Sequence, residues 1–396
     1  MNFFESGWFV AAFYITIMLL VFLNRKRFII QHKFIALYKT KLGLNLMDTW
    51  SEKYGEYLRV LGFIGIGAGF IGLITMLVFL IKNLVELVIV PNTQSAVSLV
   101  VPGVAVPGSP VTIPLISGWL ALFLVVVVHE FSHGVIARVH KIPILSSGIF
   151  FMGPLMGAFV EPDEKKLKSS ADTAQYSVYA AGPFSNMLLT LVCIGVLTFL
   201  LNPLAGAMAD PMGVAVVGVS EGLPAAQAGL ADGMIITEVN GIPVLSADEF
   251  SGQLKNLKPG ESVEILADHT KHTMVAGKNP KDPNLPHIGI LVSGQPAIAL
   301  KYEESWSYRV LFWLLNALIE LLAVTGLLSL GIGLANLLPL GPVDGGRMMQ
   351  VMLGRAKGKR KGDYVWKKIS FFTLMVLAIN LAWPVLAWAG RFLLTL

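Results

Sequence analysis

The sequence has few charged residues and a single cysteine. Only 14% of its 396 residues are Asp, Glu, Lys or Arg, against about 25% in soluble globular proteins. Hydrophobic residues make up 55% of the chain, so the composition excludes an ordinary soluble protein and indicates a membrane protein. Cys193 lies within an apolar run, which excludes a disulfide framework and a thiolate metal site. The net charge of +5 comes from basic residues beside apolar segments, so we expect no nucleic-acid partner.

Six apolar stretches approach the length of about 20 residues that a bilayer requires. They are residues 8–23, 58–90, 115–139, 174–201, 310–338 and 369–394, the last interrupted by Pro384. The second stretch carries Gly62, Gly65, Gly69 and Gly72, a spacing of small residues that lets helices pack closely. The sequence therefore predicts an α-helical polytopic membrane protein with about six transmembrane helices.

The basic residues predict how these spans are oriented. The segments between the first two spans and between the last two are rich in Lys and Arg, whereas residues 91–114 contain neither. The positive-inside rule places both basic segments in the cytoplasm. We therefore expect a cell-membrane protein whose N-terminus, C-terminus and segment 202–309 are extracytoplasmic.

Residues 209–292 contain short strand-like runs bounded by turn residues, and this length suffices for one small domain. Within it, P-A-A-Q-A-G-L-A-D-G-M-I-I-T-E-V-N-G resembles the PDZ domains of proteases. The resemblance implies a small α+β domain that binds an extended peptide at a sheet edge. Residues 212–214 and 288–290 are both candidates for the peptide-binding loop. The alternative is a spacer domain that only blocks access.

The third span ends in H-E-F-S-H, from His129 to His133. On a helix this spacing places both imidazoles on one face, where they can bind one Zn²⁺, while Glu130 can deprotonate a water. The alternative is a satisfied pair of polar groups near the membrane surface. Three ionisable residues inside a span are costly and usually functional, so we favour the metal site, toward the cytoplasmic side.

A catalytic zinc needs a third protein ligand, and four residues are candidates. His140 lies seven residues beyond His133, about 10 Å along a helix axis and too far to share the metal. Cys193 lies in mid-span, and Glu161 lies in E-P-D-E-K-K, which is typical of a solvated loop. Asp344 is the best candidate, because prolines and glycines break the helix just before it at a similar predicted depth.

Two motifs together carry a specific resemblance. H-E-F-S-H followed by N-x-x-P-x-x-P-x-D-G-G at residues 336–346 resembles the site-2 protease family of intramembrane zinc metalloproteases. The resemblance implies that His129, His133 and Asp344 are zinc ligands and that Glu130 is the general base. A further family element, G-P-x-x-N, matches residues 182–186. It implies that Asn186 and Asn336 lie near the scissile carbonyl or brace the loops, unless each merely ties helices together.

Residues 146–161 are apolar, rich in glycine and aromatics, and too broken for a spanning helix. They resemble the membrane-associated β-hairpin of site-2 proteases, which implies that a substrate adds to the hairpin as a strand. The residues that we expect to contribute are Gly153, Gly157 and Phe159. The alternative is a loop on the membrane surface.

These patterns predict five segments. They are an N-terminal transmembrane region (1–114), the first part of the protease core (115–202), the PDZ-like domain (208–293), the second part of the core (306–354), and a basic loop with the last span (355–396). The resemblance implies a zinc endopeptidase that cleaves transmembrane proteins after a first-cut protease acts on the extracytoplasmic side. The alternatives are a membrane zinc protease with a Glu ligand and a prenylated or soluble-loop substrate, a non-catalytic scaffold, and a metal transporter.

Overall fold

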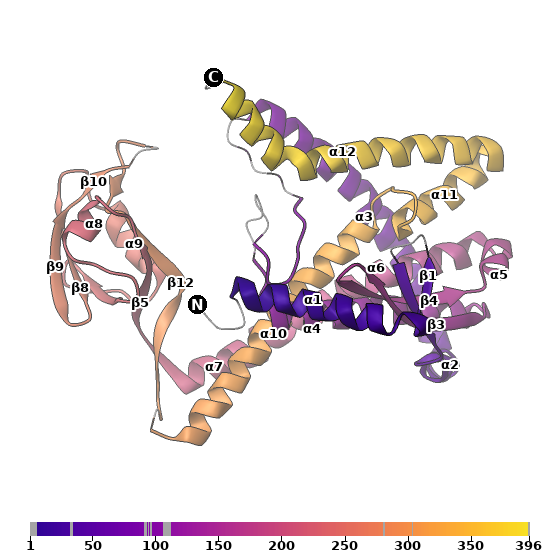
Figure 1. Cartoon of the computed structure of the whole chain (residues 1–396), viewed down its shortest axis with the longest axis horizontal. Helices are drawn as coiled ribbons and strands as arrows, with labels where there is room; N and C mark the ends of the chain where they lie inside the picture. Colours follow the sequence, from indigo (N-terminus) through magenta and orange to yellow (C-terminus); the bar gives the residue numbers. More distant parts are fainter. Residues whose placement is uncertain are drawn as a thin grey trace. The chain divides into compact units, whose positions relative to one another are not determined.

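A computed structural model describes residues 6–31, 35–90, 93, 95, 97–105, 112–279, 282–302 and 304–394, with the backbone alone at 295 and 384–394. The chain folds as two compact units. The first combines Met1–Leu197 with Leu318–Leu396, and the second is Thr198–Ala317. Figure 1 shows the elements of both units along the chain.

Helices dominate the first unit. Its helices are α1 (Gly7–Leu23), the 3₁₀ turn η2 (Arg25–Arg27), α2 (Leu44–Lys53), α3 (Gly55–Ile89), α4 (Leu115–Val139), α5 (Glu164–Ser169), α6 (Asp172–Val196), α11 (Asp344–Lys357) and α12 (Lys359–Leu394). Helix α6 continues through the π-helical turn η3 (Leu197–Leu201) into α7 (Asn202–Met208), and α10 (Trp306–Asn336) returns the chain to the first unit.

Five helices within the described residues are long and apolar enough to cross a membrane. They are α3, α4, the continuous Asp172–Met208 segment, α10 and α12. Helix α1 is apolar but has only 17 residues. The predicted count of about six spans therefore corresponds to five long helices and one shorter one. The last helix does not stop at Pro384, because α12 continues to Leu394.

Small residues let these helices approach one another. Gly62, Gly65, Gly69 and Gly72 are all buried on α3. A Cβ at Gly65 would lie 3.3 Å from the Phe184 ring of α6, and one at Gly69 would lie 2.9 Å from Met348 of α11. The glycine face predicted from the sequence is thus the surface on which α3 packs against α6 and α11.

A four-stranded antiparallel sheet also belongs to the first unit. Its strands, in spatial order, are β1 (Ile29–Gln31), β2 (Ile35–Thr40), β3 (Ile144–Met152) and β4 (Leu155–Pro162). The predicted hairpin is β3–β4, with Gly153 at φ 59° in its tight turn, where glycine avoids a steric cost. The expectation of a hairpin alone was incomplete, because β2 pairs with β3 along its whole length.

The second unit contains a sheet of short antiparallel strands. Its order is β12-β5-β6-β8-β9, with β7 paired to β6. The strands are β5 (Ala209–Val219), β6 (Ile235–Val239), β7 (Ile242–Pro243), β8 (Ser262–Ala267), β9 (Thr270–Val275) and β12 (Ile290–Leu300). A smaller pair is β10 (Gly277–Lys278) with β11 (Pro286–His287), and the helices α8 (Pro224–Gln227) and α9 (Ala247–Lys255) lie between strands of this sheet in the sequence. Its core includes Val214, Ile236, Phe250 and Ile265.

The break after α10 is a tightly packed loop rather than a simple helix end. Helix α10 stops at Asn336, and α11 begins at Asp344. Two glycines follow Asp344, and a Cβ on either would overlap loop backbone, at the Leu337 carbonyl for Gly345 and the Leu340 carbonyl for Gly346. These glycines allow α11 to start directly against the loop, which fixes the position of Asp344.

We expect Gly346→Ala to destabilise the protein by about 1–3 kcal/mol, because the added methyl meets backbone that cannot rotate away. The matched control is Gly354→Ala in the same helix, where a Cβ meets nothing within 4 Å and alanine favours the helix. The measurement is the apparent unfolding temperature in detergent. Equal temperatures for the two variants would contradict the packing role of Gly346.

Candidate metal centre

Helix α4 presents His129 and His133 one turn apart, with their Nε2 atoms 3.2 Å from each other. The Nδ1 atom of each ring, on the side away from the Nε2 atoms, faces a polar group of α6. His133 Nδ1 lies 2.7 Å from the carbonyl oxygen of Val178 in α6. A carbonyl can only accept, so Nδ1 carries the hydrogen and the neutral ring leaves its Nε2 lone pair for a metal. His129 Nδ1 lies 3.1 Å from the Asn186 amide of α6.

Asp344 completes a triangle of ligand atoms. Its Oδ2 lies 3.2 Å from His129 Nε2 and 3.4 Å from His133 Nε2. In a tetrahedral zinc site with bonds of 2.0–2.1 Å, neighbouring ligand atoms are about 3.3 Å apart. The three atoms are therefore spaced like three corners of a zinc tetrahedron, and the fourth corner remains for water or substrate. Within the described residues, this is the group of His, Cys, Asp and Glu side chains that could hold a metal.

Gly182 makes room for this triangle on α6. A Cβ at Gly182 would lie 2.5 Å from His129 Nε2 and still closer to His133 Nε2. Any larger residue would push both rings out of position. The following residue, Pro183, lies inside α6, where proline removes one helical hydrogen bond. The glycine of the G-P-x-x-N element thus has a steric reason to be there.

Glu130 lies on α4 next to the two histidines, and its carboxylate is tied to the sheet. Its Oε2 accepts a hydrogen bond of 3.1 Å from the backbone N–H of Val160 in β4. The carboxylate, both histidines and Asp344 all line one cavity of about 790 Å³. This volume is within the usual range for ligand sites, so the cavity can admit a segment of polypeptide.

The alternative ligands are not part of the triangle, although Glu161 lines the same cavity. Glu161 was expected in a solvated loop, but it lies in β4 and forms an ion pair of 2.5 Å with Lys39 of β2. Ser146 also donates to its carboxylate. The hydrogen bond from Lys39, followed by that from Ser146, lowers the pKa of Glu161. Neither His140 nor Cys193 joins the group of candidate ligands within the described residues.

The other predicted site residues divide into those that line the cavity and those that do not. Asn336 and Phe159 line the cavity. Gly157 packs against the Phe150 ring, where a Cβ would overlap it, and Gly153 lies in the hairpin turn. Asn186 is fully buried and is not among the residues that line the cavity. The structure therefore brings Asn336 toward the cavity and Asn186 behind His129.

Sequence reasoning missed several residues that line the cavity, among them Lys39, Tyr179 and Arg347. Lys39 reaches it from β2, 122 residues before its partner Glu161. Tyr179 lies on α6 and Arg347 on α11. Their positions beside Val178 and one turn after Asp344 were the only available signal.

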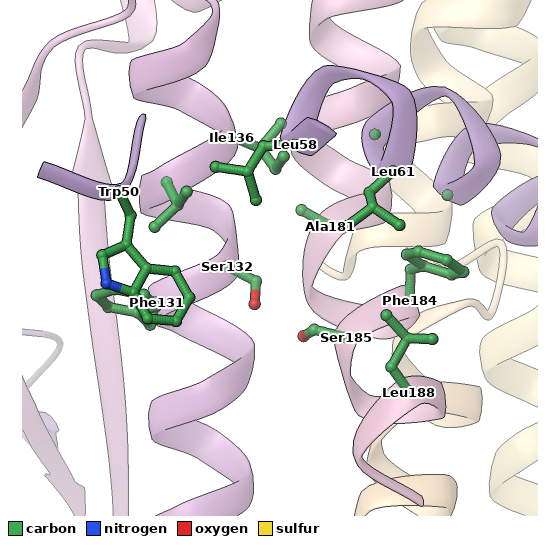
Figure 2. A pocket seen from close by; sticks show the side chains of 13 residues that line it. Trp50, Leu58, Leu61, Phe131, Ser132, Ile136, Ala181, Phe184, Ser185 and Leu188 are labelled. Carbon is green, nitrogen blue, oxygen red and sulfur yellow. The ribbon is translucent and has the colours of Figure 1, made fainter. Parts of the chain in front are cut away.

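A second cavity, of about 110 Å³, lies between α2, α3, α4 and α6. Figure 2 shows Phe131 and Ser132 of α4 on one side of it and Ala181 and Ser185 of α6 on the other. Its lining contains no ionisable residue. Of these two cavities, the larger one therefore holds the candidates for the chemistry of hydrolysis.

The chain is similar to one protein family and to several known proteins. The family described as Peptidase family M50 matches residues 117–377. An uncharacterized protein of Methanocaldococcus jannaschii is 30% identical over 315 residues, which cover 78% of this chain and 74% of that protein. A Streptococcus pyogenes protein named "Putative zinc metalloprotease" is 27% identical over 218 residues, 45% of this chain and 50% of that protein. The PDZ domain of an SdrC-like protein from Listeria monocytogenes is 30% identical with a TM-score of 0.19, covering 20% of this chain and 87% of that domain.

The family match spans more than half of the chain and runs from before His129 to beyond Asp344. It therefore contains every residue of the candidate metal centre. The chain belongs to peptidase family M50, the site-2 protease family of intramembrane zinc metalloproteases.

Proposed function

We propose that this protein is an endopeptidase that cleaves transmembrane segments of other membrane proteins, with Glu130 as its general base. The observation that supports this most directly is the triangle of His129, His133 and Asp344 atoms with Glu130 in the same cavity. A scaffold would have no reason to keep these costly groups together in an apolar unit. A transporter would need a second set of ligands, and none is found within the described residues.

His129 Nε2, His133 Nε2 and Asp344 Oδ2 would hold the zinc. When bound, zinc polarises the peptide carbonyl and lowers the pKa of water to about 7. Glu130 then accepts a proton from the attacking water and passes it to the leaving amine. The bond from Val160 N–H to Oε2 orients the carboxylate for this transfer and leaves Oε1 for the proton. Asn336 can donate to the substrate carbonyl, because its Nδ2 has a second hydrogen besides the one bonded to Ile332.

The outer edge of β4 is the proposed binding site of the substrate. Strand β4 is the last in its sheet, with β3 on one side. The N–H of Val160 faces Glu130, so the Ala158 N–H, two residues earlier in the same regular strand, lies on the same edge. A substrate segment that adds to this edge is held in extended form and is no longer helical. This matters because the peptide bonds of a transmembrane helix are shielded from attack by the hydrogen bonds of the helix.

The PDZ-like domain is proposed to select substrates that a first protease has already trimmed. Between the two candidate loops, the sheet order favours residues 288–290. They lead into β12, an edge strand, whereas Val214 of β5 pairs with both β12 and β6. Strand addition needs an open edge. By the positive-inside rule this domain is extracytoplasmic and the metal centre lies toward the cytoplasm.

We expect Glu130→Gln to lower the rate of cleavage by about 10²–10⁴-fold, because the amide cannot accept the proton. Its side-chain oxygen can still accept from Val160, so zinc binding should remain. The assay uses a model transmembrane substrate in liposomes. Ser132→Ala is the matched control, since Ser132 lies on the same helix and its hydroxyl donates to the carbonyl of Val128 in that helix. Cleavage at the wild-type rate by the Gln variant would refute the mechanism.

Substitutions of Asp344 and Glu161 test which of the two carboxylates is the third zinc ligand. We expect Asp344→Asn to reduce bound zinc to background, because the third ligand, which is the one anionic ligand of the three, is lost. Glu161→Gln should keep one zinc per chain, since Glu161 is engaged by Lys39 and Ser146. Metal analysis of both purified variants is the measurement. Zinc loss in the Glu161 variant with retention in the Asp344 variant would favour the Glu-ligand alternative.

Substrate addition at β4 predicts a specific effect of proline. Ala158→Pro removes an N–H that points away from β3, a position where an edge strand tolerates proline. We expect a lower kcat/KM for a transmembrane substrate while bound zinc stays at one per chain. The apparent unfolding temperature serves as the control for an intact hairpin. Unchanged kcat/KM in a well-folded variant would argue against strand addition at this edge.

A further inference from the structure

Asn186 sits behind the metal centre in a fully buried position on α6. Its backbone carbonyl accepts hydrogen bonds from Thr190 at 2.9 Å and from Ser329 of α10 at 2.8 Å. These bonds fix the backbone, but they leave the side-chain amide unconstrained. One amide atom, Nδ2, lies 3.1 Å from His129 Nδ1, and the other, Oδ1, has no hydrogen-bond partner within the described residues.

The tautomer of His129 decides whether it can bind a metal. A neutral imidazole carries one hydrogen, and a metal ligand must keep its coordinating nitrogen free of it. His129 Nε2 is the atom that faces His133 and Asp344. The hydrogen must therefore sit on Nδ1, which then requires an acceptor. An amide nitrogen at that point would donate instead, and it would hold the hydrogen on Nε2.

The amide of Asn186 can present either atom. Amide oxygen and nitrogen are nearly equal in size, and their assignment follows from the hydrogen-bond network. No other bond within the described residues fixes this amide. A half-turn places Oδ1 where Nδ2 is drawn, 3.1 Å from His129 Nδ1. The ring on the other ligand shows the same arrangement, because His133 Nδ1 faces the Val178 carbonyl.

We propose that Asn186 is a positioning residue for zinc, whose Oδ1 accepts the Nδ1 hydrogen of His129 and so frees Nε2 as a ligand. This inference rests on the proposed zinc site. It differs from the role near the scissile carbonyl that the resemblance implies. A carbonyl-binding residue must reach the substrate cavity, and Asn186 is not among the residues that line it.

The two roles give opposite results for one substitution. Asn186→Asp supplies only acceptor oxygens, so it can serve the His129 hydrogen but cannot donate to a substrate carbonyl. Asn186→Leu removes both functions at similar volume. We expect the Leu variant of the full-length protein in detergent to bind zinc about 10–100-fold more weakly, as for other partners of metal-bound histidines. The Asp variant should bind zinc close to the wild-type affinity.

The measurement is zinc affinity by competition with a chelator, with cleavage of a transmembrane substrate as a second readout. Thr190→Val is the matched control, because it loses a bond to the Asn186 backbone without touching His129. Its zinc affinity should equal that of wild type. Should the Asp variant fail to fold, the zinc affinities of Asn186→Leu and Thr190→Val still test whether Asn186 supports zinc binding.

Wild-type zinc affinity in Asn186→Leu would overturn the inference. If cleavage were also lost in both Asn186 variants, Asn186 would be assigned to the substrate carbonyl instead. Failure of the wild-type protein to bind zinc at all would instead refute the proposed function, so the two failures are distinguishable.

Discussion

The rest of the first unit depends on one constraint, namely that the ligand atoms of three side chains, two from α4 and one from α11, must converge on one point. The ligand atoms of His129, His133 and Asp344 lie 3.2–3.4 Å from one another. To bring them together, α4, α6 and α11 must pass closer than ordinary side chains allow. Gly182 leaves space for both imidazole rings, and Gly345 and Gly346 let α11 begin against the preceding loop. The glycines, the broken helix and the motif residues are therefore parts of a single solution.

Much of this arrangement could be predicted because apolar runs and short motifs are local signals. The third predicted span, 115–139, has the same bounds as α4. The break at Pro339–Pro342 correctly separated two helices, and Asp344 was the carboxylate beside it. Helix ends were less predictable. Helix α12 begins at Lys359, ten residues before the apolar run, because a helix can extend beyond the bilayer where charged side chains reach water.

Other features could not be predicted, because they depend on pairs far apart in the sequence. Strands β1 and β2 are short and lie in a basic segment, so nothing in the sequence indicated that β1 pairs with β2 and β2 with β3. Glu161 was expected in a loop, whereas it lies in β4 beside Lys39, which is 122 residues away in the sequence. The bond from Val160 to Glu130 uses a backbone N–H, which every residue except proline has. Sequence alone does not distinguish the one that points at the Glu130 carboxylate.

That last bond links the place where a substrate would be held to the group that would act on it. Because Glu130 is fastened to one residue of β4, a paired substrate would be measured from a fixed point on the strand. Side chains of a strand point to alternate faces of the sheet with a period of two. A bound substrate segment that shifts along β4 therefore keeps the same side chains on the same face only when it shifts by two residues. The number of residues between the paired segment and the scissile bond would then select the cleavage site. The amino-acid sequence around that bond would matter less.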